Sequence, residues 1–177
     1  MLNLIAALVL ASAPLGDDSP NVVLFLVDDL GWMDLSCQGS TIYKTPNIDR
    51  IAAEGVRFTD FYASAAICSP TRAAVQTGRY PARVGVTDWI RARFQGGAMP
   101  ADGVNPSGHH HPSEKPLEVA KNALWMNLKE TTIAEALKPA GYSAGYIGKW
   151  HLGMDAHYPT AQGYEVNRGG CDYGQPP

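Results

Sequence analysis

The chain has 177 residues, of which 45% are hydrophobic and 18% are charged, and its formal net charge is −3. This composition is that of a globular protein with one ordinary core, and it excludes a chain that is disordered throughout. The acidic balance excludes a general attraction to nucleic acid or to an anionic membrane, so binding of an anionic ligand must depend on local cations.

The chain begins with an apolar segment, MLNLIAALVLASA, that ends in small residues. This segment is too short to cross a bilayer, which takes ~20 residues, and its pattern is that of a secretory signal. We therefore expect residues 1–19 to be a signal peptide and short leader, with no stable membrane insertion and a secreted or periplasmic protein. The segment lacks Lys and Arg, and Pro14 follows the most obvious cleavage position, so an uncleaved anchor or a buried strand stays open.

The next part of the chain predicts a strand, a helix and a second strand. Residues 21–27 (NVVLFLV) form a continuous apolar, β-branched run, which is typical of a strand buried on both faces of a parallel sheet. A helix is predicted from Pro46 to about Glu54, with Gly55 as its terminator. Residues 56–61 are predicted as a second, short strand.

The run CSPTRAAVQTGRYPAR carries more chemistry than any other segment. Ser69 suits the N-cap of a helix, Pro70 suits its first position, and Gly78 suits its end. Cys68 would then lie beside the positive end of the helix, and Arg72 would add a planar cation that fits a tetrahedral oxyanion. The run therefore predicts a site for a sulfate or phosphate ester.

A segment rich in Gly, Pro and polar residues follows at about 96–116, and it predicts a long loop that is either functional or disordered. Three consecutive histidines, 109–111, lie in it. Because consecutive side chains diverge, the pattern favours a solvated loop over a metal site. If the loop folds over the mouth of the site, it would help to select a substrate, as would Trp89, Arg91 and Arg93, which precede it.

The last predicted elements are a helix and a strand. Thr132 and Glu135 have the spacing of a capping box for a helix that ends at Gly141, and a strand is predicted over 142–147. After Gly153 the sequence shows no further helical or strand pattern. The order of the elements predicts an α/β sandwich assembled from crossovers.

Two adjacent carboxylates, Asp28 and Asp29, directly follow the first predicted strand, where open α/β sheets bind ligands. Adjacent strand residues point to opposite faces, so both carboxylates reach one ion only if the backbone turns here, as Leu30 and Gly31 permit. Hard oxygen donors suit Ca²⁺ or Mg²⁺. The pattern by itself is also typical of a solvated turn.

Two sequence motifs resemble those of a known family. CSPTR at 68–72, followed by TGR at 77–79, resembles the signature of type I sulfatases, and GKWHLG at 148–153 resembles their second signature. Ala144 departs from the family, where Thr or Ser is commoner. The resemblance covers residues 20–177 and implies an α/β, alkaline-phosphatase-like sandwich with a mostly parallel sheet. It also implies that the chain is truncated, because it holds only the N-terminal portion of the family's catalytic domain.

The resemblance implies a sulfuric ester hydrolase in which Cys68 is converted to Cα-formylglycine. A formylglycine-generating or anaerobic sulfatase-maturating enzyme would perform the conversion, and the hydrated aldehyde would act through a covalent sulfo-enzyme intermediate. The catalytic residues would be Cys68, Arg72, Lys149 and His151, with Lys149 on the sulfate and His151 assisting deprotonation of the hydrate. The substrate would be a sulfated small molecule or a sulfated polysaccharide.

The resemblance further implies that Asp28, Asp29 and the hydrated Cys68 bind Ca²⁺, with Mg²⁺ as the alternative. In the family a later Asp and an Asn or Gln complete the metal shell, and a later His and Lys serve the leaving group. We find no positions for them in this sequence, so we expect the chain alone to be inactive or unfolded unless a longer product or a second chain supplies them.

Two other functions stay open. One is a related metal-dependent phosphatase or phosphodiesterase, and the other is an inactive, anion-binding fragment. If Cys68 is chemically committed, Cys37 and Cys171 can pair or stay free, because three cysteines are too few for a disulfide scaffold.

Overall fold

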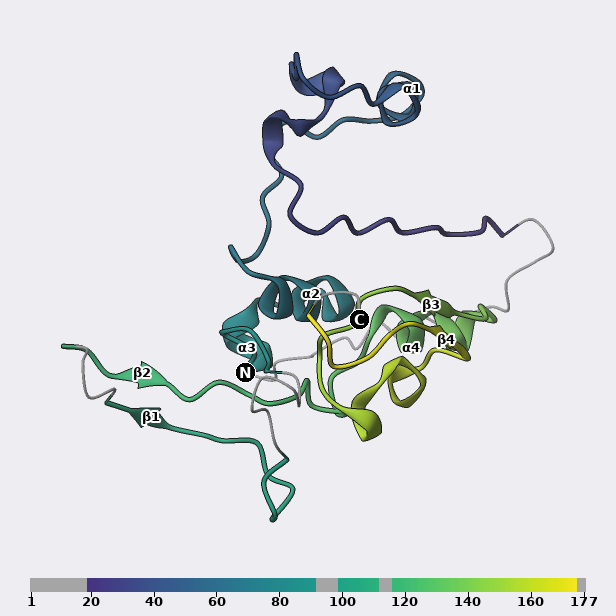
Figure 1. Cartoon of the computed structure of the whole chain (residues 1–177). Coiled ribbons are helices and arrows are strands. Elements are labelled where there is room, and N and C mark those ends of the chain that lie inside the picture. Colours follow the sequence, from purple (N-terminus) through teal and green to yellow (C-terminus); the bar gives the residue numbers. More distant parts are fainter. Residues whose placement is uncertain (1–18, 92–98, 112–115, 175–177) are drawn as a thin grey trace, which may run out of the picture. The chain divides into compact units, whose positions relative to one another are not determined.

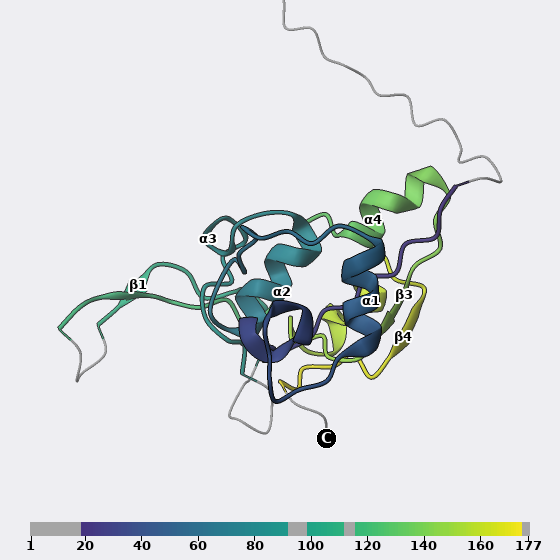
Figure 2. The ribbon, with the colours of Figure 1, turned by 90° about the horizontal axis from the view of Figure 1, so that it is seen from above.

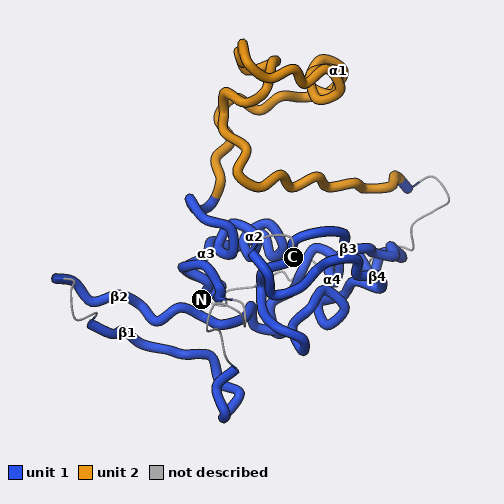
Figure 3. The backbone as a smooth tube through the Cα atoms, in the orientation of Figure 1, with its two compact units in different colours: residues 1–19, 64–177 blue, residues 20–63 orange. Residues whose placement is uncertain are grey.

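The structure is a computed structural model, and it describes residues 19–91, 99–111 and 116–174. These residues form two compact units, which are residues 20–63 (unit 2) and the described residues from Ser64 onward (unit 1) (Figure 3). Residues 1–18 of the predicted leader and Arg93 lie outside the described residues. Within the described ranges no helix has the length and apolar character needed to cross a membrane.

Unit 2 contains the α-helix α1 (Pro46–Glu54) and two 3-10 helices, η1 (Trp32–Asp34) and η2 (Ser36–Gln38) (Figure 1). The bounds of α1 are those that the sequence predicts. Proline at its first position loses no hydrogen bond there, because that N–H has no partner within a helix, and Gly55 follows its last residue.

The strand predicted over residues 21–27 is wrong. This segment runs extended without pairing to any strand of the described residues (Figure 1), and Val23 and Phe25 are 74% and 81% exposed. A strand exists only where a second backbone accepts and donates its hydrogen bonds, so an apolar run by itself does not form one. The strand predicted over residues 56–61 is wrong for the same reason.

The helical part of unit 1 begins with α2 (Cys68–Thr77) and the short α3 (Pro81–Val84) (Figure 2). Gly78, with a φ of +65°, ends α2 as predicted. The start of α2 differs from the prediction, because its N-cap is Ile67 rather than Ser69. Ser69 lies inside the first turn, where its hydroxyl bonds to other parts of the chain instead of to the helix.

The helix α4 (Ile133–Leu137) continues into the 3-10 helix η4 (Lys138–Ala140) and ends at Gly141. The predicted capping box is present. Glu135 N donates to Thr132 Oγ1 over 3.2 Å, and Thr132 N donates to Glu135 Oε2 over 2.8 Å. These reciprocal bonds satisfy two backbone donors that a helix start leaves without partners.

Two short parallel strands lie side by side, β3 (Gly145–Ile147) and β4 (Val166–Arg168), with their first residues in register (Figure 2). β3 is the last half of the strand predicted over 142–147. The prediction that no element follows Gly153 is wrong, because 3-10 helices and β4 lie beyond it. A strand of three residues is too short to show the alternation that would predict it.

Part of the predicted loop at 96–116 forms one strand of a two-stranded sheet. β1 (His109–His110) pairs antiparallel with β2 (Val119–Ala120), and both histidines are exposed. Among the described residues of this segment, the pairing replaces the expected loop only at these two positions, and residues 96–98 and 112–115 lie outside the described residues.

The core of unit 1 gathers around the segment that resembles the second sulfatase signature. The largest fully buried apolar side chains there are Ile90, Met126, Trp150 and Leu152. Burying each such side chain contributes roughly 1.5–3 kcal/mol. The segment that resembles the second signature is therefore part of the core and is not a surface loop.

Candidate functional site

α2 places Cys68 at its first helical position, where the residue is half-buried. The preceding Ile67 offers no side-chain cap. The first N–H groups of a helix have no partners within it, and the helix dipole is positive at this end. Cys68 therefore lies where an oxyanion is favoured.

Ser69 joins three segments that are distant in sequence. Its Oγ donates to the main-chain oxygen of His151 over 3.0 Å and accepts from the main-chain N of Ile90 over 3.0 Å, and the residue is fully buried. The residue next to Cys68 thus fixes the position of the His151 backbone.

His151 is 2% exposed and has a left-handed φ of +60°. Its N–H donates to Cys171 O over 3.0 Å, and its Nε2 lies 2.6 Å from Ile90 O. Because a carbonyl oxygen only accepts, Nε2 carries a proton, and in the neutral ring Nδ1 then holds the lone pair. Such a backbone conformation costs of order 1–3 kcal/mol for a non-glycine residue, and these contacts hold it in place.

Arg72 is 5% exposed and links α2 to Lys149. Its Nη1 donates to the main-chain oxygen of Lys149 and, over 3.3 Å, to Tyr146 Oη. The Tyr146 hydroxyl donates to the same Lys149 oxygen over 2.5 Å. Two donors therefore converge on one carbonyl, and the four residues named as catalytic from the sequence lie on two segments that contact each other directly.

Aromatic rings support this contact. The ring of Tyr146 meets those of Trp150 and Tyr164 edge to face, with centroids 5.0 and 5.2 Å apart. The Tyr164 hydroxyl donates to Gln76 Oε1 on α2 over 2.6 Å. Burial raises the pKa of Tyr164 to about 12, so this hydroxyl stays a neutral donor.

Asp28 and Asp29 lie at an exposed turn in unit 2, and Asp29 has a left-handed φ of +54°. This is the backbone turn that two adjacent carboxylates require to reach one ion, and two hard oxygen donors fit Ca²⁺ or Mg²⁺. Among the residues that the structure describes, no three His, Cys, Asp or Glu side chains gather as a metal group. The metal set of Asp28, Asp29 and Cys68 therefore stays a prediction.

Asn122 is a residue that sequence reasoning missed. Its Oδ1 accepts from the N–H groups of Thr87 and Asp88 over 3.1 and 3.0 Å, and its Nδ2 donates to the oxygens of Asp88 and Trp89 over 2.9 and 3.1 Å. Neither the four hydrogen bonds of Asn122 nor those of Ser69 can be predicted from the spacing of nearby residues, because their partners lie tens of residues away.

The histidines of β1 and the three cysteines form no further candidate site among the described residues. His109 and His110 are exposed on β1 and belong to no metal group of the described residues. Cys37, Cys68 and Cys171 are all free thiols.

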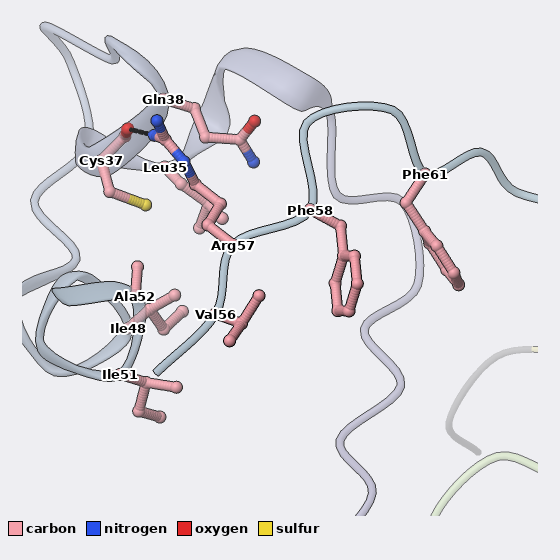
Figure 4. Close-up of a pocket in the computed structure, with 10 residues that line it drawn as sticks. All are labelled: Leu35, Cys37, Gln38, Ile48, Ile51, Ala52, Val56, Arg57, Phe58 and Phe61. Atoms are coloured by element: carbon pink, nitrogen blue, oxygen red, sulfur yellow. Dashed lines mark hydrogen bonds between the residues drawn. The ribbon is translucent and has the colours of Figure 1, made fainter. Parts of the chain in front are cut away.

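Unit 2 contains a separate hollow of about 330 Å³ (Figure 4). Its lining is mostly apolar, as with Ile48, Ile51 and Phe58. The guanidinium of Arg57 lies in it and donates to Cys37 O. None of the predicted site residues lines this hollow.

The short helices, the parallel strand pair and the contact between the two segments define a fragment of an α/β protein. The family model for Sulfatase matches residues 20–171. The chain belongs to the sulfatase family.

Curated relatives agree with this assignment. The chain is 38% identical to arylsulfatase A of Homo sapiens over 82% of its own length, and 40% identical to arylsulfatase G of Canis lupus familiaris over 82%. It is 37% identical to N-acetylgalactosamine-6-sulfatase of Sus scrofa over 89%. These matches cover 24%, 22% and 27% of the relatives, so the chain spans about a quarter of their length.

Solved structures show the same relationship. A structure of Ps i-CgsB in complex with k-i-k-neocarrahexaose matches with a TM-score of 0.58 and 30% identity, over 81% of this chain and 27% of that one. A structure from work on the metabolism of multiple glycosaminoglycans by Bacteroides thetaiotaomicron matches with a TM-score of 0.57 and 32% identity, over 79% and 26%. The chain therefore has part of the alkaline-phosphatase-like α/β fold of the sulfatases.

Proposed function

We propose that this chain is the N-terminal part of an exported sulfatase that hydrolyses sulfate monoesters, with Cys68 as the precursor of its nucleophile. One observation carries the proposal. Among the described residues only Asp29 and His151 are non-glycine residues with a left-handed φ, and both lie in the motifs that predict the site. Strained backbone of this kind is concentrated at functional sites, where surrounding contacts hold it.

Cys68 supplies the nucleophile after its oxidation by a formylglycine-generating or anaerobic sulfatase-maturating enzyme. The hydrated aldehyde offers two geminal hydroxyls, one to attack sulfur and the other to release sulfate afterwards, an exit that a simple serine ester lacks. The position of Cys68 at the start of α2 sets backbone N–H groups beside the anion.

His151 accepts the proton of the attacking hydroxyl. The bond from Nε2 to Ile90 O leaves Nδ1 as the basic nitrogen of the neutral ring and fixes the plane of the imidazole. Burial and the left-handed backbone keep the ring in one orientation.

Arg72 and Lys149 hold the sulfuryl oxygens. The chain's net charge of −3 provides no general attraction for an anion, so these local cations carry the binding. A guanidinium has five N–H donors in a fixed fork, and the bond from Nη1 to Lys149 O holds that fork in place before substrate arrives.

Asp28 and Asp29, together with the converted Cys68, would hold Ca²⁺ or Mg²⁺. Such a cation stabilises the charge of the sulfuryl oxygens and of the nucleophile. The left-handed turn at Asp29 supports this ligand pair.

The substrate is a sulfated polysaccharide or a sulfated small molecule. One relative of known structure is bound to a carrahexaose, and a curated relative is named for sulfated N-acetylgalactosamine. The apolar leader at residues 1–19 supports export to the periplasm or the medium.

The test is the chemical state of the cysteines when the chain is produced together with a formylglycine-generating enzyme. The peptide that contains Cys68 is expected to lose about 18 Da relative to the thiol, because CH₂SH becomes CHO. The peptides that contain Cys37 and Cys171 are matched controls and are expected to keep their mass. An unchanged Cys68 peptide, or equal modification of all three cysteines, contradicts the proposal.

A second measurement tests the anion site. Calorimetric titration with inorganic sulfate is expected to show binding that Lys149→Ala removes. Lys121→Ala, which changes an exposed lysine away from the two signature segments, is expected to keep that binding.

A further inference from the structure

The segment Trp89-Ile90-Arg91 connects the candidate site to the surface. Ile90 is fully buried, its N–H donates to Ser69 Oγ, and its oxygen accepts from His151 Nε2. The backbone of Ile90 is therefore bonded directly to both signature segments. Any side chain on a neighbouring residue starts only ~3.8 Å along the chain from this point.

Trp89 and Arg91, the two neighbours, form an exposed pair. Exposure alternates along the segment, so that the indole and the guanidinium lie outside while Ile90 lies inside. The Cζ atom of Arg91 lies 5.7 Å from the centroid of the Trp89 ring, and Trp89 is 37% exposed. The pair is a flat aromatic surface joined to a permanent cation.

The backbone that carries the pair is held in one conformation. Asn122 makes four hydrogen bonds to residues 87–89, and Asp88 Oδ1 accepts from Trp89 N over 2.8 Å. Little conformational freedom is left in this segment for a ligand to remove, and a group fixed in this way binds more tightly than a mobile one.

These features match one class of ligand. The face of an indole carries partial negative charge and packs against polarised C–H groups, such as those on the face of a sugar ring. The guanidinium fork pairs with a sulfate in two-point geometry. A ligand with both features, and with a second sulfate to place in the candidate site, is a sulfated oligosaccharide.

We propose that Trp89 and Arg91 form a rim subsite that binds the sugar next to the one whose sulfate occupies the candidate site. This inference rests on the proposed function and narrows its substrate from the two classes named there, a sulfated polysaccharide or a sulfated small molecule, to a sulfated oligosaccharide. An aryl or steroid sulfate has no second sulfated ring to place on the pair.

The experiment compares two probes on the 177-residue chain by calorimetry, inorganic sulfate and a sulfated carrageenan hexasaccharide. Trp89→Ala and Arg91→Ala are each expected to weaken hexasaccharide binding roughly three- to tenfold and to leave sulfate binding unchanged. Trp89→Phe keeps an aromatic ring and is expected to retain most of the affinity for the hexasaccharide. This variant controls for loss of binding that is caused by loss of the fold. Arg83→Ala is the control for loss of an exposed positive charge.

Two results overturn the inference separately from the proposed function. If sulfate binds in a Lys149-dependent manner but the hexasaccharide binds equally to the Trp89, Arg91 and Arg83 variants, the subsite is wrong and the proposed function stands. If sulfate binding is absent or does not depend on Lys149, the proposed anion site is wrong. The proposed rim subsite is then wrong as well, because it depends on that site.

Discussion

The hydroxyl of Ser69 donates to the main-chain oxygen of His151, 82 positions further along the chain, over 3.0 Å. The same oxygen atom of Ser69 accepts from Ile90 N, so one buried hydroxyl satisfies two backbone groups of different segments. Buried polar groups without partners are costly, and this single side chain prevents two such groups. The turn that carries His151 is thereby fixed to the first turn of α2.

Ser69→Ala is therefore expected to lower the free energy of unfolding by about 1–3 kcal/mol, because two buried backbone groups lose their partner. Thr77→Ala is the matched control on the same helix, since the Thr77 hydroxyl bonds locally, donating to Ala73 O over 2.7 Å and accepting from the exposed Arg79 N over 3.3 Å. Urea denaturation of both variants measures the difference. Equal losses of stability would show that the bridge of Ser69 contributes nothing beyond a helix hydroxyl.

Tyr146→Phe is expected to weaken sulfate binding more than it lowers stability. The substitution keeps the ring contacts with Trp150 and Tyr164 but removes the hydroxyl that, with Arg72, holds the Lys149 oxygen. The loss of one such hydrogen bond costs about 1 kcal/mol. Titration with inorganic sulfate and a urea transition separate the two effects. Retained sulfate affinity at reduced stability would make Tyr146 a purely structural residue.

The sequence predicted those elements whose signals are local. Gly78 at the end of α2 and the reciprocal bonds of Thr132 and Glu135 were expected because they depend on residues within one turn of each other. The strand over residues 21–27 was not formed, because strand formation depends on a partner backbone that no pattern within the segment encodes.

The candidate site divides in the same way. Cys68 and His151 could be predicted as site residues from the sequence motifs. The hydrogen bonds that bring their two segments together could not be predicted. Ser69 was expected to cap a helix, and its hydroxyl instead reaches across the fold. The role of Asn122 cannot be predicted from the sequence. An asparagine that bonds to a backbone 34 residues away has the same local pattern as any polar residue in a loop.

The stability of unit 1 is expected to fall as the pH drops below about 6.5. His157 is 7% exposed and stacks on Trp125 with ring centroids 4.9 Å apart. Burial lowers the pKa of His157 below its ordinary 6.5, although the hydrogen bond to Met154 partly opposes this shift. The folded state then binds fewer protons than the unfolded state, so the stabilisation is present above pH 6.5 and is lost as the pH falls through the lowered pKa.

His157→Gln is expected to flatten this acid dependence of the unfolding free energy. His109→Gln, at an exposed position of β1, is the control and is expected to leave the dependence as it is. Urea transitions at a series of pH values provide the measurement. An unchanged slope in the His157 variant would assign the acid sensitivity to other groups.

Two glycines of the second signature are expected to differ sharply when each is changed to alanine. Gly148 and Gly153 both have a positive φ, of +97° and +133°, so either change strains the backbone by roughly 1–2 kcal/mol. A Cβ on Gly148 meets no atom within 4 Å, whereas one on Gly153 would lie 2.6 Å from Trp125 Cβ and 2.8 Å from His157 Cβ. Because both neighbours are buried, Gly153→Ala adds an overpacking cost of about 1–3 kcal/mol. Thermal or urea unfolding of the two variants measures the gap, and equal stability would mean that the Trp125 and His157 segments move apart without cost.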